Sequence, residues 1–222
     1  GETLGVLGET GSGKSTLVNL ISRFFDPTAG RGLIDGIDIK EMNVLNLRQQ
    51  IAVVMQDVFL FSDTIKHNIM YGAPRVPFQR VQKVAQVADA SQFIERMPDQ
   101  YDTYLGERGS GLSGGQKQRL SLARGLIKDP AILILDDTTS AVDMETEVKI
   151  QEGLRQTSGQ QTTVIIANRI SSVKNADKII ILSKGRIVER GTHQGLLEKG
   201  GLYYQIYQEQ LGQAEVGEED GI

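Results

Sequence analysis

Eight consecutive residues near the start of the chain combine small, flexible positions with a lysine and a hydroxyl. They match the pattern G-x-x-x-x-G-K-[ST] and run from Gly8 to Ser15. Glycines let the backbone wrap closely around a phosphate and present several N–H donors at a helix N-terminus. Lys14 is expected to reach the terminal phosphates, and the Ser15 hydroxyl to ligate magnesium. The pattern predicts a phosphate-binding loop (the P-loop, Gly8–Ser15). Its candidate binding residues are Gly8, Thr10, Gly11, Ser12, Gly13, Lys14, Ser15 and Thr16.

A carboxylate follows the apolar run Ile132 to Leu135. A buried strand that ends in Asp136 would deliver this carboxylate to the carboxyl edge of a sheet, where it could hold a magnesium ion beside the phosphate loop. The alternative interpretation is an aspartate that only caps a strand.

A second candidate anion site begins at Ser113, where two glycines and Gln116 open a predicted long helix. The Ser113 hydroxyl and the first backbone N–H groups of the helix could bind an anion. The alternative is a simple N-capped helix.

Leu112-Ser113-Gly114-Gly115-Gln116, continued by Gln-Arg-Leu-Ser-Leu-Ala-Arg at 118–124, resembles the signature motif of ATP-binding cassette (ABC) ATPases. The resemblance covers nearly the whole chain, and the runs 60–65 and 191–193 are similar to exporter sequences. It implies that two domains face each other, each ATP lying between the P-loop of one and the signature of the other. The signature contributors would be Ser113, Gly114, Gly115 and Gln116.

The resemblance also assigns roles outside these motifs. It implies that Gln56 contacts magnesium and the attacking water, and that Ser15, Gln56 and Asp136 form the metal site. It further implies that residues 140–143 cross between the two facing domains and that residues 107–109 touch a membrane domain.

Two positions depart from the family pattern. Asp137 stands where the family places a glutamate that polarises the attacking water, and Asn168 stands where it places a histidine that touches the γ-phosphate. A displacement of about 1 Å can cost on the order of a hundredfold in rate, so the shorter Asp137 is expected to be a poorer base. Asn168 can donate a hydrogen bond but cannot become cationic. These departures predict one half of a heterodimeric exporter with a slow site of its own. The alternative is a homodimer that uses Asp137 as its base.

The elements that must position these residues alternate between short β-rich runs and helical stripes, which is typical of a parallel sheet covered by helices. Strands are expected at 3–7, 51–55, 132–135, 162–166 and 178–182, helices at 15–25, 78–90 and 114–127, and a hairpin with an Asp-Gly turn at 33–39. The expected fold is α/β, a parallel sheet flanked by helices with an inserted helical subdomain at about 61–127. The resemblance implies that the core, about 1–60 and 128–211, is a RecA-like P-loop ATPase core, and that the family's N-terminal antiparallel strands are largely missing from this sequence.

Composition narrows the class further. The 222 residues carry 23% charged and 39% hydrophobic side chains, a net charge of −4 and no cysteine. These values suit a globular domain, disfavour a nucleic-acid partner and exclude disulfides and thiolate metal sites. The motifs and the resemblance imply ATP and Mg²⁺ as cofactors. The resemblance further implies a second, non-identical ATPase domain and a fused or associated transmembrane domain as partners, at the cytoplasmic face of a membrane.

The ends of the chain carry two further expectations. The chain starts almost directly on a strand and lacks an initiator Met, so we expect a segment of a longer protein. Residues 212–222 are acidic and are expected to form a solvated, frayed tail. The two histidines, His67 and His193, are expected to have structural or surface roles. A soluble, non-transporting ABC ATPase and a regulatory nucleotide-binding module remain alternative functions.

Overall fold

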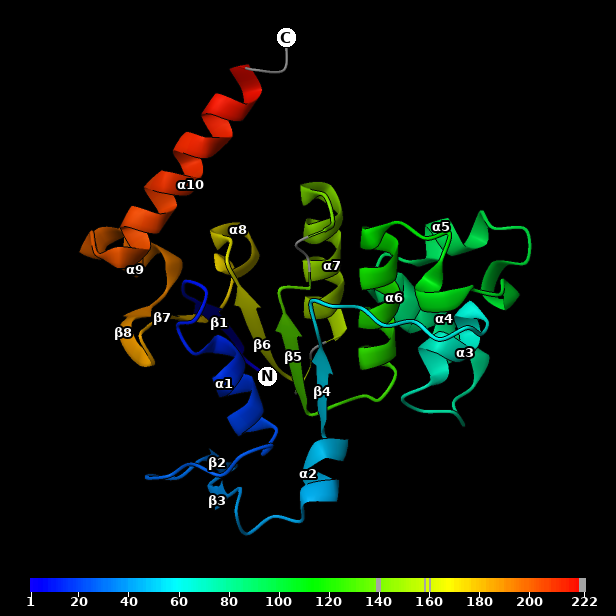
Figure 1. Cartoon of the computed structure of the whole chain (residues 1–222), viewed down its shortest axis with the longest axis horizontal. Helices are drawn as coiled ribbons and strands as arrows, with labels where there is room; N and C mark the ends of the chain where they lie inside the picture. The colour runs from blue at the N-terminus through cyan, green and yellow to red at the C-terminus, as the bar shows by residue number, and fades with distance from the viewer. Residues whose placement is uncertain (139–140, 158, 160, 220–222) are drawn as a thin grey trace. The chain divides into compact units, whose positions relative to one another are not determined.

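The computed structural model describes residues 1–138, 141–157, 159 and 161–219 (Figure 1). The chain forms two compact units. Unit 1 consists of Gly1 and Glu41–Thr162, and unit 2 consists of Glu2–Lys40 and Thr163–Ile222. Among the described residues, no helix is both long and apolar enough to span a bilayer.

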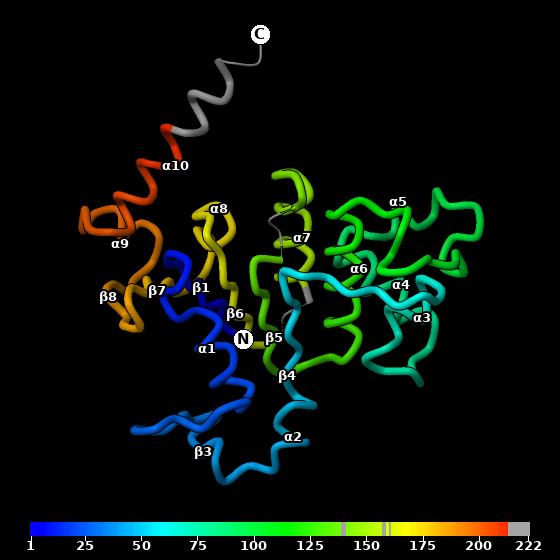
Figure 2. The backbone as a smooth tube through the Cα atoms, in the orientation of Figure 1, coloured from blue at the N-terminus to red at the C-terminus, as the bar shows by residue number. Residues whose placement is uncertain are grey.

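Unit 1 combines two parallel strands with a run of helices. Its elements are α2 (Val44–Gln49), β4 (Ile51–Val54), α3 (Ile65–Met70), α4 (Phe78–Val87), α5 (Ser91–Glu95), the 3-10 helices η1 (Gln100–Asp102) and η2 (Glu107–Gly109), α6 (Gly114–Leu126), β5 (Ile132–Asp136) and α7 (Met144–Thr157). Figure 2 shows the backbone leaving β4 and entering the helical run. Helix α6 packs closely on β4, because a Cβ on Gly125 would lie only 2.7 Å from the Val54 side chain.

Unit 2 contains the P-loop and a mostly parallel sheet. Its elements are β1 (Thr3–Leu7), α1 (Lys14–Ile21), β2 (Leu33–Ile34), β3 (Ile37–Asp38), β6 (Thr162–Ala167), α8 (Ile170–Val173), β7 (Lys178–Ser183), β8 (Arg186–Gly191), α9 (His193–Lys199) and α10 (Leu202–Glu219). Strand β1 pairs in parallel with β6 on one side and with β7 on the other, and β8 adds to β7 in antiparallel orientation. The α/β class with a mostly parallel sheet is therefore confirmed.

The predicted hairpin forms as β2 and β3, with Leu33 opposite Asp38. Its turn residues, Asp35 and Gly36, both have positive φ angles of 51° and 79°. Such a two-residue turn matches the right-handed twist of the flanking strands, which explains why Asp-Gly predicts it.

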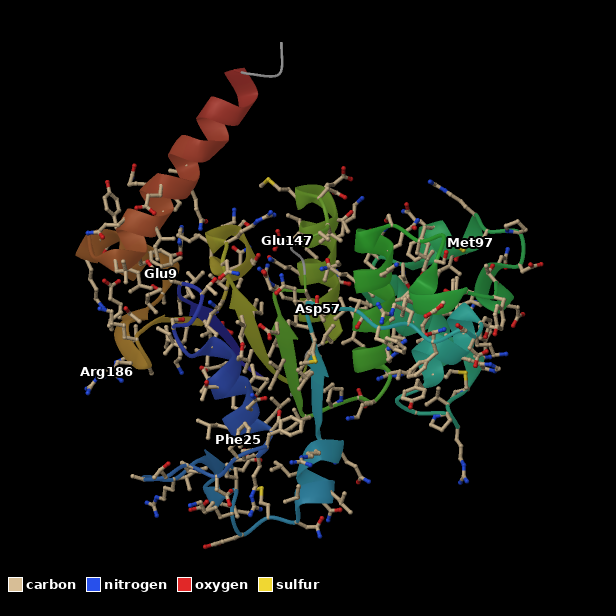
Figure 3. All side chains as sticks on the ribbon, viewed as in Figure 1. Glu9, Phe25, Asp57, Met97, Glu147 and Arg186 are labelled. Atoms are coloured by element: carbon tan, nitrogen blue, oxygen red, sulfur yellow. The ribbon has the colours of Figure 1, made fainter. Side chains whose placement is uncertain are left out.

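The first helix is shorter than predicted, because α1 ends at Ile21 and not at Phe25. Arg23 adopts a left-handed conformation with φ 49°. The N–H of Phe24 then reaches the carbonyl of Asn19 at 2.8 Å, and the N–H of Arg23 reaches Leu20 at 3.1 Å. This pair of hydrogen bonds is a Schellman motif, which ends a helix. Consequently Phe25 is 64% exposed beyond the helix and does not extend its apolar face (Figure 3).

Other boundaries differ by one to three residues. Strand β4 stops at Val54, one residue before the predicted end, and Met55 is exposed. Helix α4 stops at Val87, because Asp89 has a left-handed φ of 52°. Strand β8 was not predicted from the sequence. The backbone of α10 runs to Glu219, so the frayed tail predicted from 212 onwards is helical over its described part; residues 220–222 lie outside the described residues.

Candidate nucleotide site

The P-loop joins the end of β1 to the start of α1 inside unit 2. Gly11 and Gly13 have φ angles of 82° and 107°, a conformation that glycine adopts without a steric penalty. The turn is closed by the Ser12 N–H, which donates to the Glu9 carbonyl at 3.1 Å. The Ser12 carbonyl in turn accepts from the Gly185 N–H at 2.9 Å, which ties the loop to the β7–β8 turn. The loop conformation is therefore built by the chain itself.

Lys14 lies folded over this loop. Its ammonium donates to the carbonyls of Gly8 and Glu9, the latter at 3.0 Å. Figure 3 labels Glu9 in this loop. The charged oxygens of a bound polyphosphate would accept stronger hydrogen bonds from the Lys14 ammonium than these neutral carbonyls do.

The start of α1 fits an anionic group. Helix α1 is capped by Gly13, with no side-chain hydrogen bond at the cap and no acidic residue in the first turn. The first N–H groups of a helix have no intrahelical acceptor, and the helix dipole favours negative charge there. Ser15 and Thr16 are exposed on this first turn. These features suit the phosphates of a nucleotide.

The interior of the loop also suits a ligand. Ser12 is 4% exposed, and its hydroxyl has no hydrogen-bond partner among the described residues. A Cβ on Gly8 would lie 2.4 Å from the Leu182 carbonyl and 2.5 Å from Ser12 Oγ. Close backbone packing at Gly8 and a buried Ser12 hydroxyl without a partner in the described part of the chain are compatible with a ligand-binding loop.

Asn168 lies at the same sheet edge as the P-loop. Leu7 of β1 pairs with Ala167 of β6 in parallel register. The next residues, Gly8 and Asn168, therefore leave adjacent parallel strands at the same carboxyl end. Unit 2 thus brings together the P-loop and one of the two positions that depart from the family pattern.

Unit 1 brings together Gln56 with the two aspartates. Val54 of β4 pairs with Leu135 of β5, so Gln56 and Asp136 follow neighbouring strand ends. Gln56 is exposed, whereas Asp136 and Asp137 are half-buried. Asp137 adopts a left-handed conformation with φ 49°, which places it on a sharp turn after the strand.

No group of three or more His, Asp or Glu residues that could hold a metal ion occurs within the described part of the chain. Mg²⁺ commonly keeps water and binds through substrate phosphates with one or two protein oxygens. By chemical type, the Ser15 hydroxyl of unit 2 and the Asp136 carboxylate and Gln56 amide oxygen of unit 1 are each donors of that kind.

The signature residues form a complete helix cap. The Ser113 hydroxyl accepts from the Gln116 N–H at 3.2 Å, and the Gln116 side chain accepts from the Ser113 N–H at 2.9 Å. This reciprocal pair is a capping box. A Cβ on Gly115 would lie 3.0 Å from the Ala141 carbonyl, so the glycine permits close approach of the 141–143 segment.

The segment that the resemblance places between two domains is anchored to the same helix. The Ala141 N–H donates to the Gln118 side chain at 3.2 Å. Asp143 accepts from the Thr146 N–H and hydroxyl, both at 2.9 Å, and these bonds lower the pKa of its carboxyl. Ser140 lies outside the described residues.

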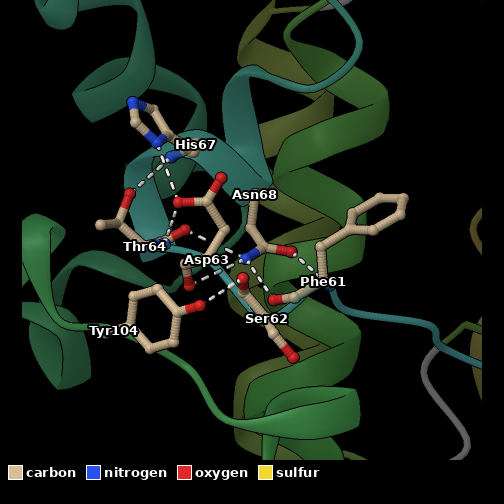
Figure 4. Close-up of polar contacts among 7 residues, drawn as sticks. All are labelled: Phe61, Ser62, Asp63, Thr64, His67, Asn68 and Tyr104. Atoms are coloured by element: carbon tan, nitrogen blue, oxygen red, sulfur yellow. Dashed lines mark hydrogen bonds and ion pairs between the residues drawn. The ribbon is translucent and has the colours of Figure 1, made fainter.

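The two histidines have the structural contacts expected of them. His67 is exposed and pairs with Asp63 through Nδ1 at 2.9 Å, while its N–H donates to the Thr64 hydroxyl (Figure 4). The Thr64 N–H and then His67 lower the pKa of the Asp63 carboxyl. His193 Nδ1 lies 2.6 Å from the Tyr203 hydroxyl.

The sequence patterns did not predict a buried hydrogen-bond network that is centred on Asn68, near His67. Asn68 is 1% exposed, and its amide donates to the carbonyls of Phe61, Asp63 and Thr64, as Figure 4 shows. Arg124 donates to the Asn68 carbonyl and side chain at 2.8 and 2.7 Å. A single buried Asn in a short helix gives no periodic signal in the sequence, so only the structure reveals this hydrogen-bond network.

The sequence of this chain matches a known protein family. Residues 1–140 match the ABC transporter family. The chain therefore belongs to the ABC transporter family and is an ABC-type ATPase domain.

Among its relatives, the ATP-dependent lipid A-core flippase of Syntrophus aciditrophicus is 47% identical over 221 residues, which cover the whole of this chain and 37% of the flippase. An uncharacterised ABC transporter ATP-binding protein of Bacillus subtilis is 53% identical over 93% of this chain and 35% of that protein. A solved bacterial Atm1-family ABC exporter with ATP bound has a TM-score of 0.91 at 43% identity, covering 95% of this chain and 37% of the exporter. The chain spans well under half the length of these relatives.

Proposed function

We propose that this chain is the ATP-binding and ATP-hydrolysing motor domain of a membrane exporter, located at the cytoplasmic face of the membrane. Lys14 and the first turn of α1 would hold the phosphates of Mg²⁺-ATP. Ser15, Gln56 and Asp136 would supply the magnesium ligands, and Asp137 would act on the attacking water. The observation that carries the proposal is the P-loop, whose backbone is shaped by Gly11 and Gly13 and whose helix start lacks a side-chain cap.

We further propose that the site of this chain is slow. Asp137 is one methylene shorter than glutamate, and Asn168 cannot carry the positive charge of a histidine. A well-placed general base raises the reaction rate by about 10² to 10⁴-fold, and we expect the shorter Asp137 to lose most of that contribution. The intact signature at Ser113–Gln116 would then complete the faster site of a non-identical partner. The competing proposal is a homodimer in which Asp137 is an adequate base.

A groove in unit 1 supports a transmembrane partner. It has a volume of about 330 Å³ and is bordered by the exposed side chains of Met55, Phe59 and Tyr71. The Tyr71 ring at the edge of the groove stacks on Phe61, and the two ring centroids lie 4.4 Å apart. Exposed apolar side chains around a concave surface are typical of an interaction site. We propose that a cytoplasmic segment of a transmembrane domain occupies this groove.

The exposed 3-10 helix η2 supports the same partner. Glu107 and Arg108 are exposed, whereas Gly109 is buried against Leu60. The buried glycine anchors the segment and leaves the two charged side chains outward. This is the segment that resembles the membrane-domain contact of exporters.

The test is magnesium-dependent phosphate release by the full-length protein without any partner, measured together with ATP affinity. Lys14→Ala should abolish both signals. Tight binding with almost no turnover would support the slow site, and Asp137→Glu with Asn168→His should then raise turnover by at least about tenfold. Turnover of about 1 s⁻¹ or faster in the unaltered protein would contradict the slow site and favour a homodimer. ATPase activity without any stimulation by membrane reconstitution would favour a soluble, non-transporting ATPase.

A further inference from the structure

A glutamine of the C-terminal helix holds the loop that carries Asn168. Gln210 Nε2 donates to the Asn168 carbonyl at 2.9 Å, and Gln210 Oε1 accepts from the Ile170 N–H at 2.9 Å. One side-chain amide thus binds a carbonyl and an N–H that flank Arg169. Two hydrogen bonds in opposite directions fix both the position and the orientation of this short backbone segment.

Packing of α10 places Gln210 at this loop. Tyr203, Ile206, Tyr207 and Gln210 follow the spacing i, i+3, i+4, i+7, which puts them on one face of a helix. Tyr203 is fully buried in an apolar cluster with residues of β1, β6, β7 and α8, and Ile206 and Tyr207 pack against that cluster. Gln210 therefore continues an apolar face and is half-buried there.

The start of α10 is also fixed. The Glu189 carboxylate of β8 accepts from the N–H groups of Leu202 and Tyr203, the latter at 3.2 Å. Burial raises the pKa of Tyr203 to about 12, so its phenol keeps its proton at neutral pH and can donate to His193. Helix α10 is thus anchored at its first turn and reaches the Asn168 loop two turns later.

We propose that Gln210 is a positioning residue that holds Asn168 at the γ-phosphate of bound ATP. The inference rests on the proposed function. The register of β1 and β6 supports it, because it starts the P-loop and the Asn168 loop at the same sheet edge. ADP lacks the γ-phosphate, so loss of the Gln210 bonds should weaken ATP binding and spare ADP binding.

The test compares Gln210→Met with Gln208→Met, a control on an exposed position of the same helix. Methionine keeps the length and helix propensity of glutamine but makes neither strong hydrogen bond. In the full-length protein, the affinity of this chain would be measured by photolabelling with an azido-ATP in the presence of Mg²⁺, with a non-hydrolysable ATP analogue and ADP as competitors. Gln210→Met should weaken binding of the ATP analogue by about three- to tenfold and leave ADP binding within about twofold, because a displaced Asn168 loses at most its one hydrogen bond to the γ-phosphate.

Asn168→Ala provides the second arm. If Gln210 acts through Asn168, Gln210→Met should have no further effect on ATP binding in the Asn168→Ala background. Equal losses of ATP and ADP affinity, or an undiminished loss in that background, would overturn the inference and leave Gln210 a purely structural role. Labelling of the unaltered protein that Lys14→Ala fails to abolish would instead refute the proposed function.

Discussion

The two anion sites expected from the sequence would lie at the N-termini of α1 and α6, and these two helix starts are capped differently. The start of α6 is satisfied by its own side chains, through the Ser113–Gln116 capping box. The start of α1 follows a glycine and has no side-chain cap. Its nearby lysine is held by loop carbonyls, and the Ser12 hydroxyl is buried without a partner among the described residues.

This difference separates a surface that is stable by itself from a site that a ligand completes. A capped helix start keeps its shape with or without nucleotide. An uncapped start with a flanking lysine gains most when phosphate oxygens arrive. This contrast agrees with the proposed function, in which the P-loop would bind ATP and the preformed signature would complete the site of a partner.

The largest effect is expected at Gly8, where a substitution tests whether close packing shapes the P-loop. Gly8→Ala places a Cβ 2.4 Å from the Leu182 carbonyl, so the loop backbone must shift. Loss of one hydrogen bond to a charged phosphate, about 1.5–3 kcal/mol, should reduce ATP affinity by about 10- to 100-fold, which nucleotide titration would measure. Gly36→Ala is the control. This variant strains the backbone of the distant hairpin, because Gly36 has a positive φ, but its new Cβ would lie in open space. Equal affinities of the two variants would show that the P-loop is not built by close packing.

The next effect is at the signature. Ser113→Ala should lower the free energy of unfolding by about 1 kcal/mol without nucleotide, because the capping hydrogen bond is lost. Denaturant unfolding of the purified protein would measure it. Ser12→Ala is the matched comparison, since its hydroxyl has no partner to lose, and its unfolding free energy should change by less than about 0.5 kcal/mol. The opposite order of the two values would contradict the contrast between the two helix starts.

The smallest effect concerns pH and sharpens the comparison with a third helix start, that of α7. Asp143 caps this start through Thr146, and these hydrogen bonds lower the pKa of its carboxyl. A lowered folded-state pKa gives stability that is present above the unfolded value of about 3.9 and is lost as the pH falls through the folded value. Stability curves between pH 5 and pH 2 should therefore be shallower for Asp143→Asn than for the unaltered protein. Parallel curves would show that the carboxylate contributes no pH dependence.

Local sequence was sufficient for the chemistry-bearing motifs. The P-loop needs glycines at fixed offsets between a strand and a helix, and the capping box needs a serine three residues before a glutamine. Both motifs can be recognised from neighbouring residues alone, although contacts with Leu182 and Gly185 also hold the P-loop in the folded chain. The Asp-Gly turn at Asp35 and Gly36 belongs to the same group, and the α/β class followed from the alternation of strand and helix patterns.

Local sequence was insufficient where distant residues decide the outcome. The apolar spacing of Phe24 and Phe25 suggested a longer first helix, but Arg23 adopts a left-handed conformation there. Its guanidinium is held by Asp26 at 3.0 Å and by the Ile39 carbonyl at 2.9 Å.

The sequence by itself therefore determined the family, the α/β class and the positions of the P-loop, the signature and the strand-end carboxylates, because each depends on short-range pattern. Only the tertiary structure revealed that Leu7 and Ala167 lie opposite each other and that Gln210 binds the loop of Asn168. These contacts join residues far apart in the chain. They are fixed by strand register and by burial of the Tyr203 face of α10, neither of which is encoded in any local stretch of residues.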